Sequence, residues 1–184
     1  MDIKILSDFS VSGDLYNLIR LIANRVGSHI DYQKMGGILG ISRNKIKEYI
    51  ELLEKTYFLI NIAPFTNNID AELKRRQKMY LADTGLLQVL GKVNSGQAFE
   101  NAIAIQLSRI GKVQYYQRAR GFEIDFILDE TMGIEVKETP TRQDLTTLHN
   151  RTASAGLGQY LVAGKNPPQS DFRDFVWGGN LIKR

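Results

Sequence analysis

The 184-residue sequence contains no cysteine, four prolines, one tryptophan and only two histidines. Without cysteine, a disulfide scaffold, a cysteine-ligated zinc site and a thiol nucleophile are all excluded. His29 and His149 are the sole imidazoles, so a histidine-rich transition-metal site is excluded as well. Metal chemistry is therefore confined to carboxylate oxygens, which suit hard cations such as Mg²⁺ or Mn²⁺.

Long hydrophobic runs are also missing. No stretch approaches the ~20 apolar residues that a membrane helix needs, and the sequence does not begin as a signal peptide. We therefore expect a soluble, cytoplasmic protein without a membrane partner. The hydrophobic fraction of 43% is sufficient for a core, which excludes a disordered chain. The net charge of +4 is only mildly basic and does not by itself indicate nucleic-acid binding.

A small, polar segment from Gly91 to Gln97 separates two patterned halves of the chain. Such segments, rich in residues that interrupt helices and strands, are typical of domain boundaries. The sequence therefore predicts two domains, residues 1–92 and residues 93–184. Each has about ninety residues, which is small but sufficient to fold.

The first half has the element order of a winged helix-turn-helix. The expected helices begin at Ser12 or Asp14, Asp31 and Ser42, and the last of them, ending near Lys55, follows a tight turn at Gly40. Two short strands at 57–62 and 79–82 then form a hairpin. Three helices followed by a hairpin are the order that predicts this fold.

Two basic clusters would face DNA in such a domain. A recognition helix enters the major groove by its N-terminal end, while the wing contacts the phosphate backbone. Solvated polar surfaces and a protein-docking role are the alternatives for these clusters. The candidate DNA-binding residues are Arg43, Asn44, Lys45 and Lys47 at the start of the third helix, and Lys74, Arg75, Arg76 and Lys78 in the loop between the strands.

The second half is expected to contain a helix, three strands, a helix and a strand. The strands are predicted at 113–118, 122–128, 134–137 and 160–163, with helices at 98–110 and after Pro140. In the second strand the side chains should alternate between two faces. Phe122, Ile124, Phe126 and Leu128 are expected on one face, and Glu123, Asp125 and Ile127 on the other.

Carboxylates and one amine concentrate on two of these strands. Glu135 and Lys137 are two residues apart, so a strand directs both side chains to one face. Asp125 lies on the neighbouring strand, and Glu100 on the preceding helix completes the group. Carboxylates placed this close repel each other unless a cation lies between them, which favours a divalent ion. A merely solvated charged face is the alternative.

This arrangement, with Asp125 on one strand and Glu135-Val136-Lys137 on the next, resembles the PD-(D/E)xK restriction-endonuclease-like fold, with Ile124 in place of the motif's proline. The whole chain resembles the C-terminal part of a prokaryotic AAA-type P-loop ATPase family whose members carry a winged helix and a nuclease-like domain long labelled as of unknown function. The match is carried by blocks at 39–42, 49–54, 80–87, 98–101, 115–120, 123–126 and 134–137.

The resemblance implies an α/β (α+β) chain in which the winged helix precedes an αβββαβ nuclease-like domain. It also implies roles for site residues. Asp125, Glu135 and the Val136 carbonyl would bind Mg²⁺ or Mn²⁺, Lys137 would be the catalytic lysine and Glu100 an auxiliary acid. Arg118 and Arg120 would contact phosphate, or else keep a hairpin loop charged.

The ATP-binding motif of that family is missing from this chain. The nearest candidate, Gly158 to Asn166, has one residue too many and lacks Ser or Thr after its lysine. We therefore expect a divalent-metal-dependent DNA endonuclease-like module that works with an upstream or separately encoded P-loop ATPase. The alternatives are a non-catalytic DNA-binding or regulatory module, and a protein-docking or self-associating module with a relic nuclease fold.

Overall fold

The computed structural model describes residues 9–66, 70, 76–118, 121–168, 174–178 and 181. Three helices open the chain: α1 (Phe9–Ala23), α2 (Tyr32–Leu39) and α3 (Arg43–Lys55). The Asp31 side chain accepts the Lys34 N–H at the start of α2, and the Ser42 side chain accepts the Lys45 N–H at the start of α3. Gly40 ends α2 with a φ of 72°, a left-handed conformation that suits glycine. The tight turn expected before the third helix is confirmed.

An antiparallel hairpin follows, formed by β1 (Leu59–Pro64) and β2 (Lys78–Leu81). One side of β2, carrying Met79 and Leu81, packs into a core with the buried faces of the three helices. Tyr80, on the other side of β2, belongs to the core of the second half. The strand β2 is thus shared between the two halves of the chain.

The short helix α5 (Thr84–Leu90) was not expected from the sequence. The Asp83 side chain caps it by accepting the Leu86 N–H, and Leu87 is buried below. With only seven residues, this helix is too short for hydrophobic periodicity to reveal it.

The second half begins with α6 (Ser95–Ser108), which starts at a capping box formed by Asn94 and Gln97. Then come β3 (Val113–Arg118), β4 (Phe122–Leu128), β5 (Met132–Lys137), α7 (Arg142–Ala155), β6 (Gln159–Gly164) and β7 (Phe175–Trp177). The expected positions of the first two of these strands are confirmed, whereas the three-residue β7 was not foreseen.

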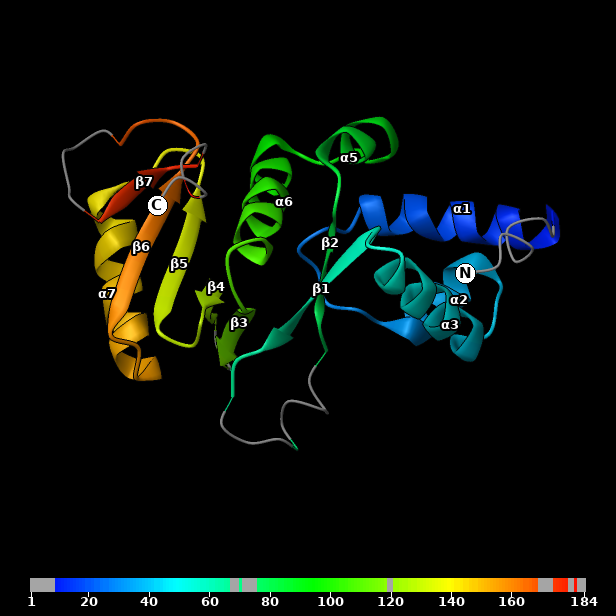
Figure 1. Cartoon of the computed structure of the whole chain (residues 1–184), viewed down its shortest axis with the longest axis horizontal. Coiled ribbons are helices and arrows are strands. Elements are labelled where there is room, and N and C mark those ends of the chain that lie inside the picture. Colours follow the sequence, from blue (N-terminus) through cyan, green and yellow to red (C-terminus); the bar gives the residue numbers. More distant parts are fainter. Residues whose placement is uncertain are drawn as a thin grey trace.

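All seven strands form one mixed sheet in the order β2-β1-β3-β4-β5-β6-β7 (Figure 1). The two halves join where Ala63 and Pro64 of β1 pair in parallel with Gln114 and Tyr115 of β3. The segment at 91–97, where the sequence predicts a domain boundary, leads into the Asn94 cap of α6. The fold is therefore a mixed α/β arrangement with a sheet that crosses the predicted boundary.

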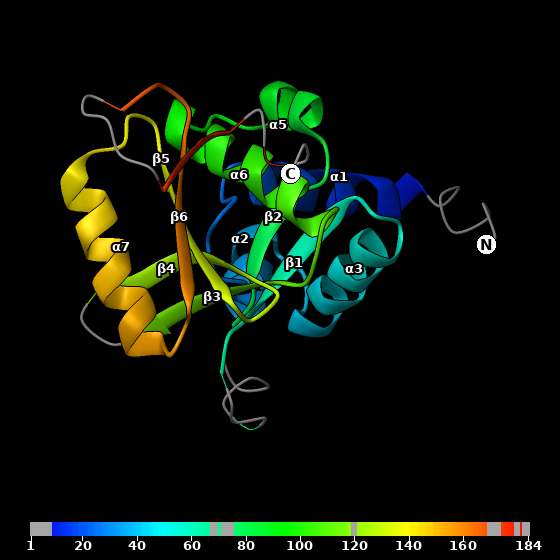
Figure 2. The ribbon, with the colours of Figure 1, turned by 60° about the vertical axis from the view of Figure 1, so that its left-hand side comes forward.

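The helices α6 and α7 cover opposite faces of the strands of the second half (Figure 2). Ile103 and Leu107 of α6 pack in one core, and Leu148 of α7 packs in another. Among the described residues, no helix is long and apolar enough to cross a membrane.

A register shift in β4 overturns the expected alternation of its side chains. Between the pairs Gln114–Ile127 and Tyr116–Ile124, β3 advances two residues while β4 advances three. An extra residue of this kind is a β-bulge, which redirects the side chains beside it. Phe122 and Ile124 consequently pack on the α7 side, whereas Phe126 and Leu128 pack on the α6 side. Asp125 lies in this shifted segment.

Candidate active site

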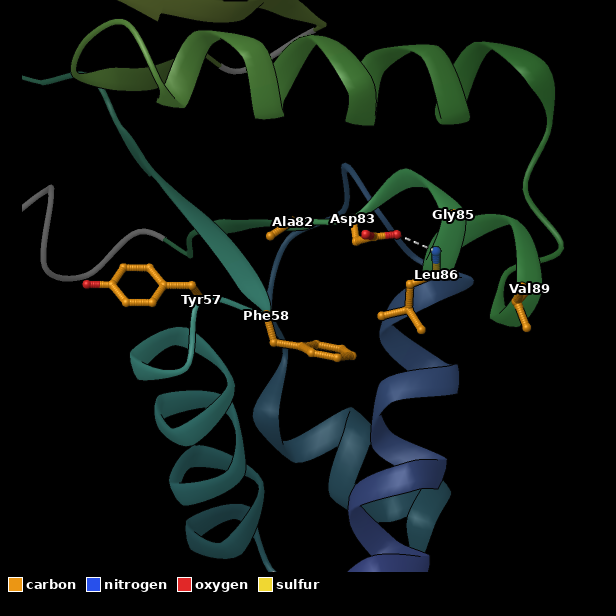
Figure 3. A pocket seen from close by; sticks show the side chains of 7 residues that line it. All are labelled: Tyr57, Phe58, Ala82, Asp83, Gly85, Leu86 and Val89. Carbon is orange, nitrogen blue, oxygen red and sulfur yellow. Dashed lines mark hydrogen bonds between the residues drawn. The ribbon is translucent and has the colours of Figure 1, made fainter. Parts of the chain in front are cut away.

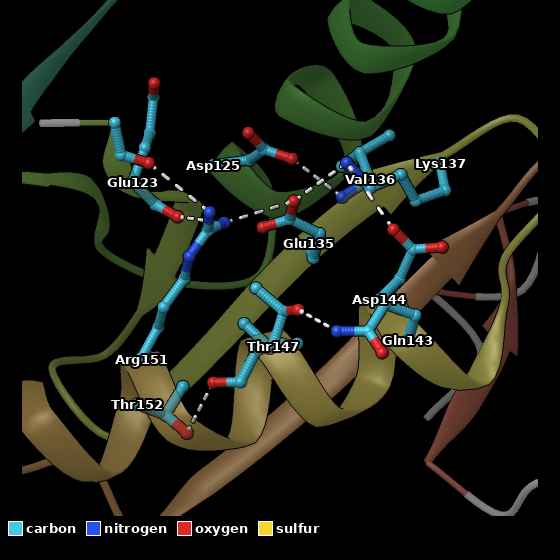
Figure 4. Close-up of polar contacts among 12 residues, drawn as sticks. Glu123, Asp125, Glu135, Val136, Lys137, Gln143, Asp144, Thr147, Arg151 and Thr152 are labelled. Carbon is cyan, nitrogen blue, oxygen red and sulfur yellow. Dashed lines mark hydrogen bonds and ion pairs between the residues drawn. The ribbon is translucent and has the colours of Figure 1, made fainter.

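The candidate site lies where β4 and β5 part. The pairs that join these strands run from Leu128–Met132 to Phe126–Ile134, so Asp125 and Glu135 come directly after the last pair. Here the Asp125 carboxylate takes the place of a strand partner, because its Oδ2 accepts the Val136 N–H at 2.8 Å (Figure 4). The bulge and the fork together place Asp125 between the two strands.

Glu135 and Lys137 lie on the same side of β5, as their spacing predicts. The Lys137 Nζ is 2.9 Å from Glu135 Oε1 and 4.0 Å from Asp144 Oδ1 of α7 (Figure 4). Burial by itself lowers the pKa of the Lys137 ammonium, but the hydrogen bond to Glu135 and the nearby carboxylates outweigh burial and raise this pKa. Lys137 therefore carries its positive charge at neutral pH.

The Glu135 carboxylate is buried, with 6% of the residue exposed. Its Oε1 faces Lys137, whereas its Oε2 has no hydrogen-bond partner among the described residues. Burial, followed by the charge of Asp125, raises the pKa of Glu135 from 4.5 to about 7. A buried carboxylate oxygen without a donor is costly, and a cation would relieve both the burial and the repulsion.

Asp125 experiences the same opposing influences. Burial raises the pKa of the Asp125 carboxyl, while the Val136 N–H and the charges of Lys78 and Lys137 lower it, and the net shift is upward. Two acids with raised pKa values that flank one amine are typical of functional sites.

Glu100 of α6 lies against β2. Its Oε1 accepts a hydrogen bond of 2.6 Å from the Tyr80 hydroxyl. Burial, followed by the charge of Asp125, raises the pKa of Glu100. The backbone of Gly27 closes over this side chain, since a Cβ at Gly27 would lie 3.1 Å from Glu100 Oε1.

The donor set fits a hard cation in its chemistry: carboxylate oxygens, one of them buried without a partner, and no sulfur or imidazole. Within the described ranges, however, no three His, Cys, Asp or Glu side chains form a group that could hold a metal ion. A metal site here would depend on Asp125 and Glu135, and main-chain oxygen such as that of Val136 would have to supply further ligands.

Sequence reasoning did not identify Arg151 of α7 as part of the site. Its NH1 donates to the Glu123 carbonyl at 2.7 Å and lies 3.6 Å from Glu135 Oε1 (Figure 4). One signal was present, because Arg151 follows the buried Leu148 by three residues and so lies near the buried side of its helix.

The expected wing residue Lys78 lies in β2 rather than in a loop. It is buried, with 4% of the residue exposed, and its ammonium pairs with Glu123. Arg76, just before β2, is exposed and pairs with Asp31 at 2.7 Å. The neighbouring candidates Lys74 and Arg75 lie outside the described residues, as does Arg120.

At the start of α3, Arg43, Asn44 and Lys47 are exposed and Lys45 is half-buried. Two of these amines have acidic neighbours on the same helix, Glu48 at 3.3 Å from Lys45 and Glu51 at 3.8 Å from Lys47. Such surface ion pairs contribute little to stability.

Arg118 ends β3 at the surface, and its guanidinium lies 5.4 Å from the Tyr116 ring. It also lies 6.0 Å from the ring of Phe122. The Arg118 guanidinium thus lies against aromatic rings of the β3–β4 hairpin. Within the described part of the chain it forms no ion pair with a carboxylate.

A pocket of about 600 Å³ lies elsewhere, between the end of α3 and α5 (Figure 3). Its walls include the exposed Tyr57 and Val89 and the half-buried Phe58. The one titratable carboxylate there, that of Asp83, caps α5. This pocket contains none of the candidate catalytic groups.

Comparisons with known proteins give a family but no activity. The family described as "Domain of unknown function (DUF8612)" matches residues 1–97. An uncharacterized protein of Haemophilus influenzae is 26% identical over 171 residues, covering 85% of this chain and 42% of that protein. The chain thus spans less than half the length of this relative. No solved structure gives a significant match.

Proposed function

We propose that this chain, which belongs to the family described as Domain of unknown function (DUF8612), is a divalent-metal-dependent DNA endonuclease-like module. The observation that carries the proposal is the convergence of Asp125, Glu135 and Lys137 at the fork between β4 and β5. The bulge in β4 supports it, since bulges often redirect side chains beside active sites.

In this proposal Asp125, Glu135 and the Val136 carbonyl hold Mg²⁺ or Mn²⁺. When bound, the ion supplies an activated water and neutralises charge on the phosphate. The Lys137 ammonium, kept protonated by Glu135 and Asp144, stabilises the negative charge that develops on the phosphate oxygens. Glu100 serves as the auxiliary acid on the α6 side of the site.

The first half of the chain would act as a winged helix-turn-helix. Its supporting features are the element order, the capped α3 and the exposed groups at the N-terminal end of α3, Arg43, Asn44 and Lys47, with the half-buried Lys45 beside them. Arg76 and Arg118 would contact backbone phosphates. In this proposal the module acts in the cytoplasm.

The proposal includes an association with a P-loop ATPase. The Haemophilus relative is more than twice as long as the region that matches this chain, so it has room for a further domain. The same association could be made by a separately encoded protein.

The decisive experiment for the catalytic role is nicking of supercoiled plasmid by the full chain with Mg²⁺ or Mn²⁺. Lys137→Ala should abolish nicking, with a loss of at least ~100-fold, because the charge-stabilising ammonium is removed. Lys112→Ala, which removes an exposed partner of Glu130 at the far end of β4, is the matched control and should retain activity. Equal activity of both variants would contradict the proposal, as would an inactive, correctly folded wild type.

DNA binding is tested by the salt dependence of affinity. Arg43→Ala should weaken binding of a duplex and reduce the slope of log Kd against log salt by about 1 for a lost phosphate contact. Arg109→Ala, at the end of α6 and away from α3, serves as the control. If both variants show the same slope, Arg43 makes no phosphate contact, and the proposed role of α3 in DNA binding is contradicted.

One observation favours a second candidate, a non-catalytic DNA-binding or regulatory module with a relic nuclease fold. Within the described residues no three-acid metal group is present, and Lys137 and Asp125 already have protein partners. A folded wild type that binds DNA, neither cleaves it nor binds Mn²⁺, and tolerates Asp125→Asn would establish this candidate. A stable oligomer that binds no DNA at low salt would indicate a protein-docking module instead.

A further inference from the structure

The strand β2 directs two side chains toward the candidate site. Lys78 and Tyr80 are two residues apart and therefore share one side of the strand. Met79 and Leu81, on the other side, pack into the core of α1, α2 and α3. The side of β2 that faces away from those helices thus faces the carboxylates of the second half.

Tyr80 makes direct contact with a site acid. It is fully buried, and its hydroxyl donates a hydrogen bond of 2.6 Å to Glu100 Oε1. Its ring lies 5.5 Å from that of Phe126, the residue after Asp125. Burial and the charge of Glu100 raise the pKa of the Tyr80 phenol well above its usual value, so the hydroxyl remains a donor.

Lys78 supplies a buried cation. Its ammonium pairs with Glu123, which is two residues from Asp125, and it lies 5.4 Å from the centre of the Tyr115 ring. The charge of Lys78 acts on both Glu100 and Asp125 and opposes the upward shift that burial causes in the pKa of each. A buried ammonium is costly unless it is paired, and Glu123 is the carboxylate that pairs with Lys78.

Other contacts hold β2 in this position. The Asn101 side chain, fully buried on α6, accepts the Leu81 N–H at 2.8 Å and donates to the Leu81 carbonyl at 2.9 Å. Opposite, the Gly27 N–H donates to the Met79 carbonyl at 2.8 Å. Because Asn101 follows Glu100 directly, the helix that carries the auxiliary acid is attached to the strand that carries its hydrogen-bond donor.

We infer that Tyr80 and Lys78 are positioning residues of the hydrolytic site, and that the site is therefore completed by the half of the chain that carries the DNA-binding helices. Tyr80 fixes the orientation of Glu100, and Lys78 holds Glu123 and offsets the negative charge beside Asp125. This inference rests on the proposed nuclease function.

A double-mutant cycle in the full chain tests the role of Tyr80. Plasmid nicking with Mn²⁺ is measured for wild type, Tyr80→Phe, Glu100→Gln and the double variant. Tyr80→Phe removes one oxygen without a change of shape and should lower kcat about tenfold while KM for DNA stays unchanged. In the Glu100→Gln background the same substitution should have no further effect, because Tyr80 acts through Glu100.

Lys78→Met with Glu123→Gln forms an independent cycle that should show the same non-additivity. Tyr160→Phe, a half-buried tyrosine of β6 whose ring contacts His149, is the control and should leave kcat unchanged. Thermal unfolding of every variant identifies losses that come from stability alone.

The possible results separate the inference from the function on which it rests. Active wild type with multiplicative effects in both cycles overturns the inference and leaves the nuclease function intact. A change in KM rather than kcat overturns it as well, since it would place Tyr80 in DNA binding. A wild type that is inactive with every metal, while folded, overturns the nuclease function and this inference with it.

Discussion

Glu135 is the residue at which the stability and the proposed chemistry of the site oppose each other. Its carboxylate is buried, one of its oxygens lacks a hydrogen-bond donor among the described residues, and Asp125 lies close by. Ionised Glu135 therefore costs folding free energy. A site that binds a cation needs this ionised, poorly solvated form, because the cation then supplies the favourable interaction that the carboxylate does not find in the protein.

The first prediction concerns pH. The pKa of Glu135 is raised from 4.5 in the unfolded chain to about 7 in the folded protein. The folded state thus binds more protons between these values, and the stability that protonated Glu135 provides is complete below pH 4.5 and lost as pH rises to about 7. Relative to Glu135→Gln, wild type should lose roughly 3 kcal/mol of unfolding free energy across this range, measured by urea denaturation.

Parallel stability curves for wild type and Glu135→Gln from pH 4.5 to 7.5 would contradict this assignment. Gln159→Ala, a change of an exposed, non-titratable side chain of β6, is the control, and its curve should run parallel to that of wild type.

The second prediction concerns metal binding at pH 8. Mn²⁺ at ~100 times its Kd should stabilise the protein by about 2.7 kcal/mol, which corresponds to a rise in Tm of roughly 5 °C or more. Asp125→Asn should abolish this rise, since it removes one of the two carboxylates at the fork. Lys165→Met is the control and should show the same rise in Tm as wild type. A rise that persists in Asp125→Asn would show that Mn²⁺ binds at another site.

At the scale of elements, the close packing of α7 on β5 sets the position of Arg151 relative to Glu135. Gly133 makes this approach possible, because a Cβ there would lie 2.3 Å from Thr152 Cγ2. The neighbouring residues on α7 and β5 carry the contact between Arg151 NH1 and Glu135 Oε1 at 3.6 Å. The separation of helix and strand therefore determines the surroundings of the buried acid.

Gly133→Ala should accordingly displace α7 and lower the unfolding free energy by about 1–3 kcal/mol, as overpacking does. Gly158→Ala, where an added Cβ meets nothing within 4 Å, is a matched control in the loop after α7 and should change stability by less than ~0.5 kcal/mol. Denaturation midpoints measure both. Similar losses for the two variants would indicate a general effect of removing glycine.

At the scale of the whole molecule, the sheet and the side chains of β2 bind the two halves together. Three sets of contacts join residues before position 91 to residues after position 97. They are the strand pairing of β1 with β3, the Asn101–Leu81 hydrogen bonds and the Tyr80–Glu100 hydrogen bond. These are buried, directional contacts, and their loss on separation would leave polar groups unpaired.

We therefore predict one cooperative unfolding transition for the full chain. The single tryptophan, Trp177 on β7, reports on the far edge of the sheet, whereas far-UV circular dichroism reports mainly on the helices. The two denaturation curves should coincide, as two-state unfolding requires. Two separate midpoints would contradict this prediction and would support independent domains divided at residues 92 and 93.

Much of this structure could be predicted from local sequence. The Ser42 cap, the Gly40 turn and the limits of β3 and β4 follow from capping preferences and alternation. The convergence of Asp125 with Glu135 follows from two strands joined by a short turn. By contrast, the bulge at Asp125 shifts the faces of β4 without a marker in the sequence, and Arg151 depends on how closely α7 packs.

The sequence determined one part of the candidate site, and the tertiary structure determined another. The sequence alone limited the donors available to a cation, since a protein without cysteine and with two histidines offers mainly oxygen ligands. The spacing of Glu135 and Lys137 placed both on one side of a strand. Only the tertiary structure decided that Lys78 and Tyr80 join them, 45 residues from Glu123 and 20 from Glu100 respectively. Contacts between segments so far apart depend on strand order and burial, which no local pattern encodes.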